Sequence, residues 1–405
     1  MPKITEKKDV TKYRAMESDS RLHERHRKVL KQVNDILEGI RQVVVGNALE
    51  RIASAVVVGL FSLGDSSPGF VKKIKKQVRG EIVIEQIRVE PSKLAGHILL
   101  KGPPGGGKTL MGKTLASLTD LLFGRIQMTP DKTPRDITVR RVQEGEEVFT
   151  YYGPIFSNIL LADEINRATP KTQSALLEAM SEGAVTYEEA GNTITRQLDN
   201  PFHVTGTLNP VEKGEGTYNL PAAQLDRFMF QILFELPDAE TIDAVLELTE
   251  AHEKMVIGPV TDLASVLDAR DFIRNEIEVP KNVKRYIRRL IMATYDPFTF
   301  KEIFPELKEK LGGQPLVLLP PNSRAAMHLQ NAAKTIACFS GERVVDSYHV
   351  QKRFFEIVNH RFILNDNLRP LYDEFGGPEG FIKALITGDR VTGRKGLLQV
   401  VPVDE

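Results

Sequence analysis

Hydrophobic and polar positions follow two different patterns along this chain, and the pattern changes near Pro237. Before that point, short apolar runs alternate with stretches of helical spacing, with runs at 97–100, 158–161 and 202–208 and helical spacing at 109–122 and 170–180. Strands that alternate with helices predict a parallel sheet flanked by helices. Beyond Pro237 only helical spacing remains, at 239–252, 281–295, 323–339 and 346–361. This half is predicted to be an all-helical domain.

These changes predict four regions. They are a charged N-terminal helical arm over 1–37, an α/β core over 38–236, a helical domain over 237–365 and a C-terminal extension over 366–405. Within the core, the loop signal at 66–69 and the alternation of Ile82, Ile84 and Ile87 indicate a surface insertion at about 65–93, read as a loop or hairpin. A second hairpin is predicted at 185–195, around Ala190-Gly191-Asn192.

Charge and composition narrow the class of protein. The 405 residues include 54 Lys and Arg and 54 Asp and Glu, so the net charge of zero excludes a globally basic nucleic-acid coat. The first 31 residues are locally basic, which fits either a solvated helical arm or an arm that binds a partner or nucleic acid. The single cysteine, Cys338, excludes an internal disulfide and a cysteine-based zinc site. Neither a signal peptide nor an apolar stretch of membrane-spanning length is found, and a cytoplasmic protein is expected.

A glycine-rich loop provides the strongest chemical signal. Gly102-Pro103-Pro104-Gly105-Gly106-Gly107-Lys108-Thr109 fits G-x-x-x-x-G-K-[ST] and stands between an apolar run and a helical stretch. Glycines allow backbone N–H groups to surround phosphates, and the helix N-terminus adds its dipole. Lys108 is expected to reach the outer phosphates and Thr109 to offer its hydroxyl to Mg²⁺. The predicted nucleotide contacts in this segment are Pro104, Gly105, Gly106, Gly107, Lys108, Thr109 and Leu110.

Two acids follow the apolar run at 158–161. Asp163 is expected to hold the metal, and Glu164 to orient and deprotonate an attacking water. Hydrolysis of a phosphoanhydride needs both functions on one rigid element near the last phosphate.

Three further positions could complete the site. Asn209 could hold the lytic water, although an Asn before Pro210 also suits a plain turn. Arg227 could act on the nucleotide of a neighbouring subunit or pair with Asp226 at the surface. Arg324, in the first turn of a predicted helix, could face the phosphates or be solvated.

Taken in order, these motifs resemble the AAA+ ATPases and, within them, the MoxR family. The resemblance rests on Val44-Val45-Gly46-Asn47, Ala162-Asp163-Glu164-Ile165-Asn166-Arg167-Ala168, Asn209-Pro210 and Gln224-Leu225-Asp226-Arg227-Phe228. The chain departs from the family where Thr207-Leu208 replaces the usual Thr-Gln.

The resemblance implies a five-stranded parallel sheet of order 5-1-4-3-2 with a helical lid, binding ATP and Mg²⁺ in a ring that is expected to be a hexamer. It places Gly46 and Asn47 beside the adenine, and makes Asn209 the sensor 1 residue, Arg227 the trans-acting finger and Arg324 the sensor 2 residue. It also implies a chaperone-like remodeller or maturation factor for protein complexes, with a von Willebrand A domain protein as a possible partner. A nucleic-acid-directed motor or loader, and a nucleotide-gated scaffold that hydrolyses little, are the alternative functions.

Overall fold

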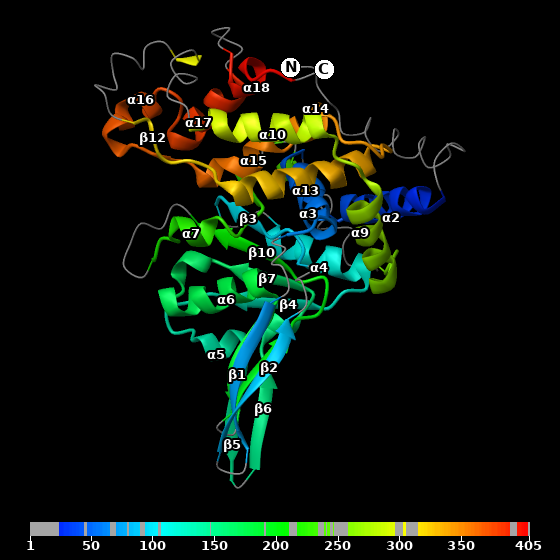
Figure 1. Cartoon of the computed structure of the whole chain (residues 1–405), viewed down its shortest axis with the longest axis vertical. Helices are drawn as coiled ribbons and strands as arrows, with labels where there is room; N and C mark the ends of the chain where they lie inside the picture. The colour runs from blue at the N-terminus through cyan, green and yellow to red at the C-terminus, as the bar shows by residue number, and fades with distance from the viewer. Residues whose placement is uncertain are drawn as a thin grey trace.

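A helical lid lies over a sheet domain, from which β-hairpins extend on the side away from the lid (Figure 1). The structure is a computed structural model. It describes residues 24–43, 47–64, 70–78, 81–89, 94–103, 107–145, 147–189, 192–209, 217–233, a few positions within 239–246, 258–295, 303–304, 315–388 and 395–403. Among these residues, no helix combines the length and the apolar character needed to cross a membrane.

The sheet has five parallel strands and confirms the expected order. In chain order they are β3 (Ile98–Lys101), β4 (Phe123–Gln127), β7 (Ile159–Asp163), β10 (His203–Leu208) and β11 (Phe230–Leu233). Their spatial order is β11-β3-β10-β7-β4, which is 5-1-4-3-2 when the five strands are numbered along the chain. The strands that carry the predicted phosphate loop, the acid pair and Asn209 are therefore neighbours, and their carboxyl ends meet at one edge.

Each face of the sheet has its own apolar cluster. Ile98 and Leu100 of β3 point into a cluster shared with α3 (Asn47–Phe61), α4 (Lys108–Thr119) and the lid. Leu99, between them, points into a second cluster beneath α6 (Pro170–Glu182). This alternation is what a central strand buried on both faces requires. Short elements complete this half: α5 (Pro134–Ile137), η1 (Pro154–Phe156), η2 (Ile165–Arg167) and α7 (Ala222–Leu225).

The N-terminal region contains a packed helix. α2 (Glu24–Arg41) buries Val29, Val33 and Ile36 against the same cluster and contacts α3, α4 and α13. Its spacing of apolar residues at three and four positions makes one face apolar, although the sequence around it is charged. Val43, which follows this helix, lies in a turn, and the next two valines are outside the described residues.

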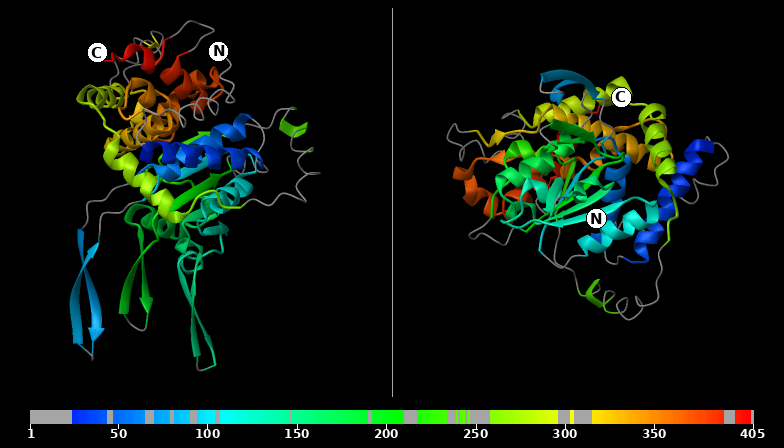
Figure 2. Two further views of the ribbon diagram at one scale, coloured as in Figure 1. Left: turned by 90° about the vertical axis from the view of Figure 1, so that its right-hand side faces the viewer. Right: turned by 90° about the horizontal axis from the view of Figure 1, so that it is seen from below.

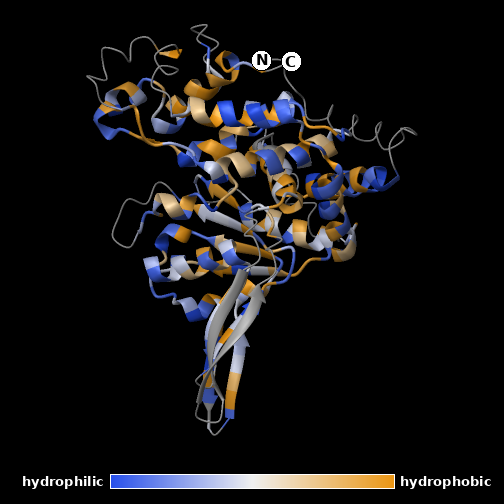
Figure 3. Cartoon of the chain, viewed as in Figure 1, coloured by the Kyte–Doolittle hydropathy of each residue, from blue (hydrophilic) through white to orange (hydrophobic). Residues whose placement is uncertain are grey.

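The lid is helical as predicted, with one small antiparallel strand pair. Its elements are α9 (Leu263–Glu276), α10 (Lys281–Ala293), α13 (Ser323–Phe339), α14 (Ser347–Gln351), α15 (Phe354–Val358), η4 (Asn359–Arg361), η5 (Asp366–Leu368), α16 (Arg369–Asp373), α17 (Pro378–Thr387), α18 (Leu397–Val400), β12 (Val317–Leu319) and β13 (Ile363–Leu364). Figure 3 shows α10 with a polar outer side, as expected for a helix that covers a core.

The single helix expected over 346–361 is interrupted, which corrects the sequence-based prediction. Arg353 leaves the helical conformation at φ −127° and ψ 16°. Its guanidinium donates to Glu356 Oε1 at 3.2 Å and to Ser54 Oγ of α3 at 3.1 Å. These contacts tie the break to the sheet domain, a tertiary effect that helical periodicity does not reveal.

Three two-stranded hairpins extend from the sheet domain in one direction (Figure 2). They are formed by β1 (Phe70–Val78) with β2 (Glu81–Val89), β5 (Val139–Glu144) with β6 (Glu147–Tyr152), and β8 (Ala184–Glu189) with β9 (Asn192–Gln197). The first occupies the stretch where the sequence indicates an insertion, and its β1 contacts β9 of the third.

Candidate active site

A cavity of about 390 Å³ opens at the carboxyl ends of the central strands. It is lined by residues 107–110 at the start of α4, by Asp163 at the end of β7 and Glu164 just after it, and by Asn209 after β10. Ligands in open α/β sheets bind at this edge. Arg125 and Gln127 of β4 and Thr207 of β10 complete the lining. Among the described residues, the structure thus brings together most of those that the sequence singled out.

The start of α4 forms one wall. Gly107 precedes the helix with φ 69°, a left-handed conformation that glycine adopts without steric cost. Lys108 is partly buried, and its Nζ donates to the carbonyl of Gly102 at 3.3 Å. Burial lowers the pKa of Lys108, and the charges of Asp163 and Glu164 oppose that shift. A lysine held there has its charge directed toward the acids and the cavity.

The predicted nucleotide contacts differ in how far the structure describes them. Gly46 and Pro104, Gly105 and Gly106 lie outside the described residues, and Asn47 is described only as the first residue of α3. Of the remaining loop contacts, Thr109 is half-buried and Leu110 is exposed at the cavity wall.

Asp163 is a buried carboxylate that forms an ion pair with an arginine. Arg125 Nε donates to its Oδ2 at 2.9 Å, and Thr207 Oγ1 donates to its Oδ1 at 3.4 Å. The Arg125 side chain is 47% exposed whereas that of Asp163 is 11% exposed, so the arginine can leave the pair more easily than the acid. This carboxylate is thus a position at which a cation is stabilised.

Glu164 lies in a strained turn. Its φ of 55° and ψ of 52° are left-handed, which for a residue with a side chain costs about 1–3 kcal/mol and is typical of functional sites. Its backbone N–H donates to Thr207 Oγ1 at 2.8 Å, and its Oε2 accepts from Arg167 Nη1 at 3.0 Å. The turn thereby places the Glu164 backbone beside Thr207 while the carboxylate is paired with Arg167.

Asn209 is buried at the end of β10, and its carbonyl accepts from Asn166 Nδ2 at 3.4 Å. Sequence reasoning missed Thr207 as a site residue, although it precedes Asn209 by two positions and so lies on the same face of the strand. Arg125, Gln127 and Arg167 were not singled out as site residues either. Only the pairing of β4 with β7 brings the first two to this edge.

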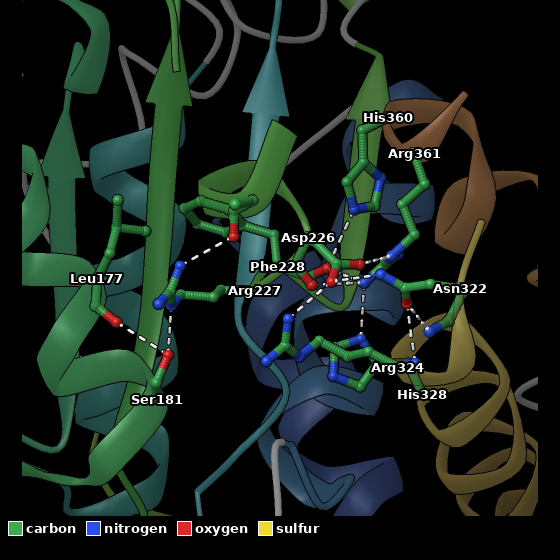
Figure 4. A network of polar contacts seen from close by, with 12 residues as sticks. Leu177, Ser181, Asp226, Arg227, Phe228, Asn322, Arg324, His328, His360 and Arg361 are labelled. Carbon is green, nitrogen blue, oxygen red and sulfur yellow. Dashed lines mark hydrogen bonds and ion pairs between the residues drawn. The ribbon is translucent and has the colours of Figure 1, made fainter. Parts of the chain in front are cut away.

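The two predicted arginines lie apart from the cavity described above. Arg227 Nη1 donates to the carbonyl of Ala223 at 2.8 Å, and its Nε bonds Ser181 Oγ of α6. Arg324 Nη1 bonds Asp226 Oδ2 at 2.7 Å. The Arg227 side chain points from the segment 226–228 toward Ser181, whereas Arg324 reaches Asp226 from the lid (Figure 4). The sequence-based alternative of an Arg227–Asp226 pair is therefore not what is seen: Asp226 pairs with other arginines.

Comparison with known proteins places the chain. A family profile described as "ATPase family associated with various cellular activities (AAA)" matches residues 97–230. YeaC of Bacillus subtilis is 38% identical over 67% of this chain and 78% of its own length. The chaperone MoxR1 of Mycobacterium tuberculosis is 37% identical over 66% of this chain and 68% of its own. A crystal structure from Cytophaga hutchinsonii, described as a candidate ATPase, is 30% identical with a TM-score of 0.70, covering 93% of this chain and 97% of that one. With the site geometry above, these likenesses show that the chain belongs to the MoxR family of AAA+ ATPases and is an ATP-hydrolysing enzyme.

Proposed function

We propose that this chain is a Mg²⁺-dependent ATPase that works as a hexameric ring and remodels or matures protein complexes. The observation that carries the catalytic part is the meeting of Lys108, Asp163, Glu164 and Asn209 around one cavity. A lysine at a helix N-terminus, a metal-binding carboxylate, a base and an amide are the groups that nucleotide hydrolysis requires.

The residues at the cavity suit ATP and magnesium. The α4 N-terminus and Lys108 supply positive potential for phosphates, and Thr109 and Asp163 supply the oxygen ligands that Mg²⁺ prefers. Asp163 pairs with Arg125, so a divalent cation held by Asp163 would take the place of that guanidinium. When bound, the metal neutralises charge on the outer phosphates. In this proposal Gly46 and Asn47 lie beside the adenine.

Glu164 is proposed as the general base and Asn209 as the residue that positions the water. Arg167 must release the Glu164 carboxylate before that carboxylate can turn to a water, because its Oε2 now accepts the hydrogen bond from Arg167 Nη1. The left-handed turn at Glu164 directs its backbone to Thr207, so the side chain can change partners while its main chain stays anchored.

Arg227 is proposed to act on the site of a neighbouring subunit. It lies away from its own cavity and is half-buried near the end of α6. Guanidinium stabilises charge that develops on a transferring phosphoryl group, and such a group can be provided by another subunit. Arg324 is proposed to respond to the chain's own nucleotide as the lid moves.

The remodelling role is supported by the printed name of one relative, the chaperone MoxR1, and by the three hairpins that extend in one direction. Exposed aromatic side chains on β6, Phe149, Tyr151 and Tyr152, offer a surface of the kind that contacts protein partners. A von Willebrand A domain protein is the proposed partner class. A cytoplasmic location belongs to the same proposal, since the protein requires ATP.

The catalytic proposal is tested by ATP turnover of the purified chain and of two variants. Lys108→Ala should lose nucleotide binding, whereas Glu164→Gln should bind ATP normally and hydrolyse it at least about 100-fold more slowly. Wild-type turnover equal to that of Glu164→Gln, with binding intact, would instead support the nucleotide-gated scaffold. Light scattering with and without ATP measures the ring size.

Trans action is tested by mixed rings. Arg227→Ala should bind ATP and lose turnover, and rings co-expressed with Lys108→Ala should recover part of it, because each variant supplies what the other lacks. No recovery in intact mixed rings would refute the finger role. For the client, the Glu164→Gln protein loaded with ATP is mixed with a purified von Willebrand A domain protein, and ATP-dependent complex formation is the expected result.

A further inference from the structure

Asp226, the residue before Arg227, is a buried carboxylate shared by three donors of the lid. Arg361 Nε donates to its Oδ1 at 2.7 Å, and Arg324 Nη1 and Asn322 Nδ2 donate to its Oδ2 at 2.7 and 2.9 Å. The Asp226 side chain is only 10% exposed. Burial acts to raise its pKa, but Arg361, Asn322 and Arg324 overcome this and hold the pKa at about 2. Asp226 is thus a permanent anion beneath the lid.

The lid also holds the main chain on both sides of Arg227. Arg361 Nη2 donates to the carbonyls of Asp226 and Phe228 at 2.9 and 2.7 Å, and it contacts His328 Nδ1 at 2.9 Å. His360 Nε2 donates to the Phe228 carbonyl at 3.0 Å. The η4 turn therefore contacts the peptide groups that flank Arg227, as Figure 4 shows.

The Arg227 side chain points away from these contacts, toward Ser181 and the Ala223 carbonyl. The lid therefore holds the base of this side chain rather than its guanidinium. Arg361 bonds both the carboxylate and the main-chain carbonyl of Asp226, so a change at the carboxylate is transmitted to the backbone from which Arg227 extends.

The two arginines on Asp226 differ in how firmly they are held. The Arg361 side chain is 2% exposed and makes bonds to main-chain carbonyls as well, whereas the Arg324 side chain is 35% exposed. Arg324 is also the arginine that the proposed function assigns to the chain's own nucleotide. One partner of Asp226 is thus fixed and the other can exchange.

We propose that Asp226 and Arg361 are positioning residues for Arg227, and that Arg324 exchanges between Asp226 and the chain's own nucleotide. This inference rests on the proposed function, in which Arg227 acts in trans. One carboxylate then links the nucleotide state of a subunit, through Arg324, to the finger that this subunit offers its neighbour.

The test uses Asp226→Asn in full-length rings, with Glu356→Gln as the matched control. Glu356 forms a buried lid ion pair with Arg353 and makes none of the contacts described for 226–228. Asp226→Asn should keep the KM for ATP within about twofold and lower kcat at least about tenfold, while Glu356→Gln should turn over ATP as wild type does. Hydrogen exchange should increase over 222–230 in Asp226→Asn and remain unchanged at the start of α4.

Mixed rings locate the defect. Co-expressed with Lys108→Ala, the Asp226→Asn subunit should regain turnover several-fold above the two parents, because the Lys108→Ala subunit offers an intact finger. Co-expressed with Arg227→Ala it should regain none, because both subunits lack a working finger. A purely structural role for Asp226 would lower activity equally in both mixtures.

The outcomes separate this inference from the proposed function. If Arg227→Ala is rescued by Lys108→Ala but Asp226→Asn is not, trans action stands and the positioning role is refuted. Wild-type kcat in Asp226→Asn, or an equal loss in Glu356→Gln, also refutes it. If neither variant is rescued, trans action fails and this inference fails with it.

A second pair of variants keeps the test open if Asp226→Asn does not fold. Asn322 is exposed and caps α13 with its Oδ1, so Asn322→Asp and Asn322→Ser both preserve the cap. Only Asn322→Asp places a carboxylate against Asp226. Each change is placed in the Lys108→Ala subunit, which offers its finger to an Arg227→Ala subunit. There Asn322→Asp should lower the rescued turnover at least about threefold relative to Asn322→Ser, and equal rescue by the two variants would refute the role of Asp226.

Discussion

Gly206 in the central strand β10 provides a quantitative test of the packing beneath the site. It pairs with Leu99 of β3 on one side and Ala162 of β7 on the other. A Cβ at this position would lie well inside the van der Waals contact distance from Ile165 Cδ1, and 3.2 Å from Phe228 Cε1. These neighbours are fully buried, so none can move into solvent.

The expected cost of Gly206→Ala follows from two opposing terms. Overpacking of a close-packed core costs about 1–3 kcal/mol. The lower entropy of alanine in the unfolded chain returns about 0.4–1 kcal/mol. The net loss in the free energy of unfolding is about 1–2 kcal/mol. Because Thr207 is the next residue and bonds both Asp163 and the Glu164 backbone, ATP turnover should fall as well.

A double-mutant cycle with Ile165→Val isolates the clash. Valine lacks the Cδ1 methyl, and alone it should cost about 0.5–1.5 kcal/mol. Added to Gly206→Ala it should cost close to nothing, which gives a coupling energy of about 1 kcal/mol. The chain has no Trp, so denaturant unfolding is followed by far-UV circular dichroism. Ile336→Val in the lid is the control and should be additive with Gly206→Ala. Additivity of Ile165→Val as well would refute the packing argument.

Three further predictions concern the metal, acid stability and a hairpin. Arg125→Gln removes the guanidinium that pairs with Asp163, and such a half-exposed pair contributes at most about 1 kcal/mol. The half-saturating Mg²⁺ concentration for turnover should therefore fall by up to about fivefold. An unchanged value would show that Arg125 does not compete with the metal. Burial, and then the charge of the neighbouring His97, lower the pKa of His203 from 6.5 to about 3. The contribution of neutral His203 to the free energy of unfolding is therefore fully present above pH 6.5. It falls as acid protonates this histidine in the unfolded chain, by about 2 kcal/mol at pH 5. The denaturation midpoints of His203→Gln at pH 7 and 5 should therefore differ less than those of wild type, and an equal difference would contradict this account. Gly153→Ala brings a Cβ against the main chain of residues 137 and 138 at the base of the β5–β6 hairpin and should speed proteolysis of that hairpin. Gly258→Ala, whose Cβ meets nothing within 4 Å, is the control and should leave the rate of proteolysis unchanged. Equal rates for the two variants would refute the clash.

Local sequence was sufficient to predict the elements that depend on consecutive residues. The helix that begins at Lys108, the buried run that leads to Asp163 and the helical stretch of α13 each depend on a few adjacent positions, and each is found where the sequence predicts it. The strand order followed from the family resemblance. Periodicity and capping act over three or four residues, so they can be read from the chain alone.

The tertiary structure decided which charges meet. Arg125 on β4 bonds Asp163 on the neighbouring strand β7, and Arg361 bonds Asp226, which lies 135 residues earlier in the sequence. Ion pairs of this kind depend on which strands are neighbours and on how the lid lies over the sheet. Neither can be predicted from the spacing of residues in the sequence. The chain by itself therefore determines that a nucleotide site exists, because main-chain curvature and helix polarity are local properties. The fold decides how the acids and arginines around that site are paired, because electrostatic contacts are set by distance in space.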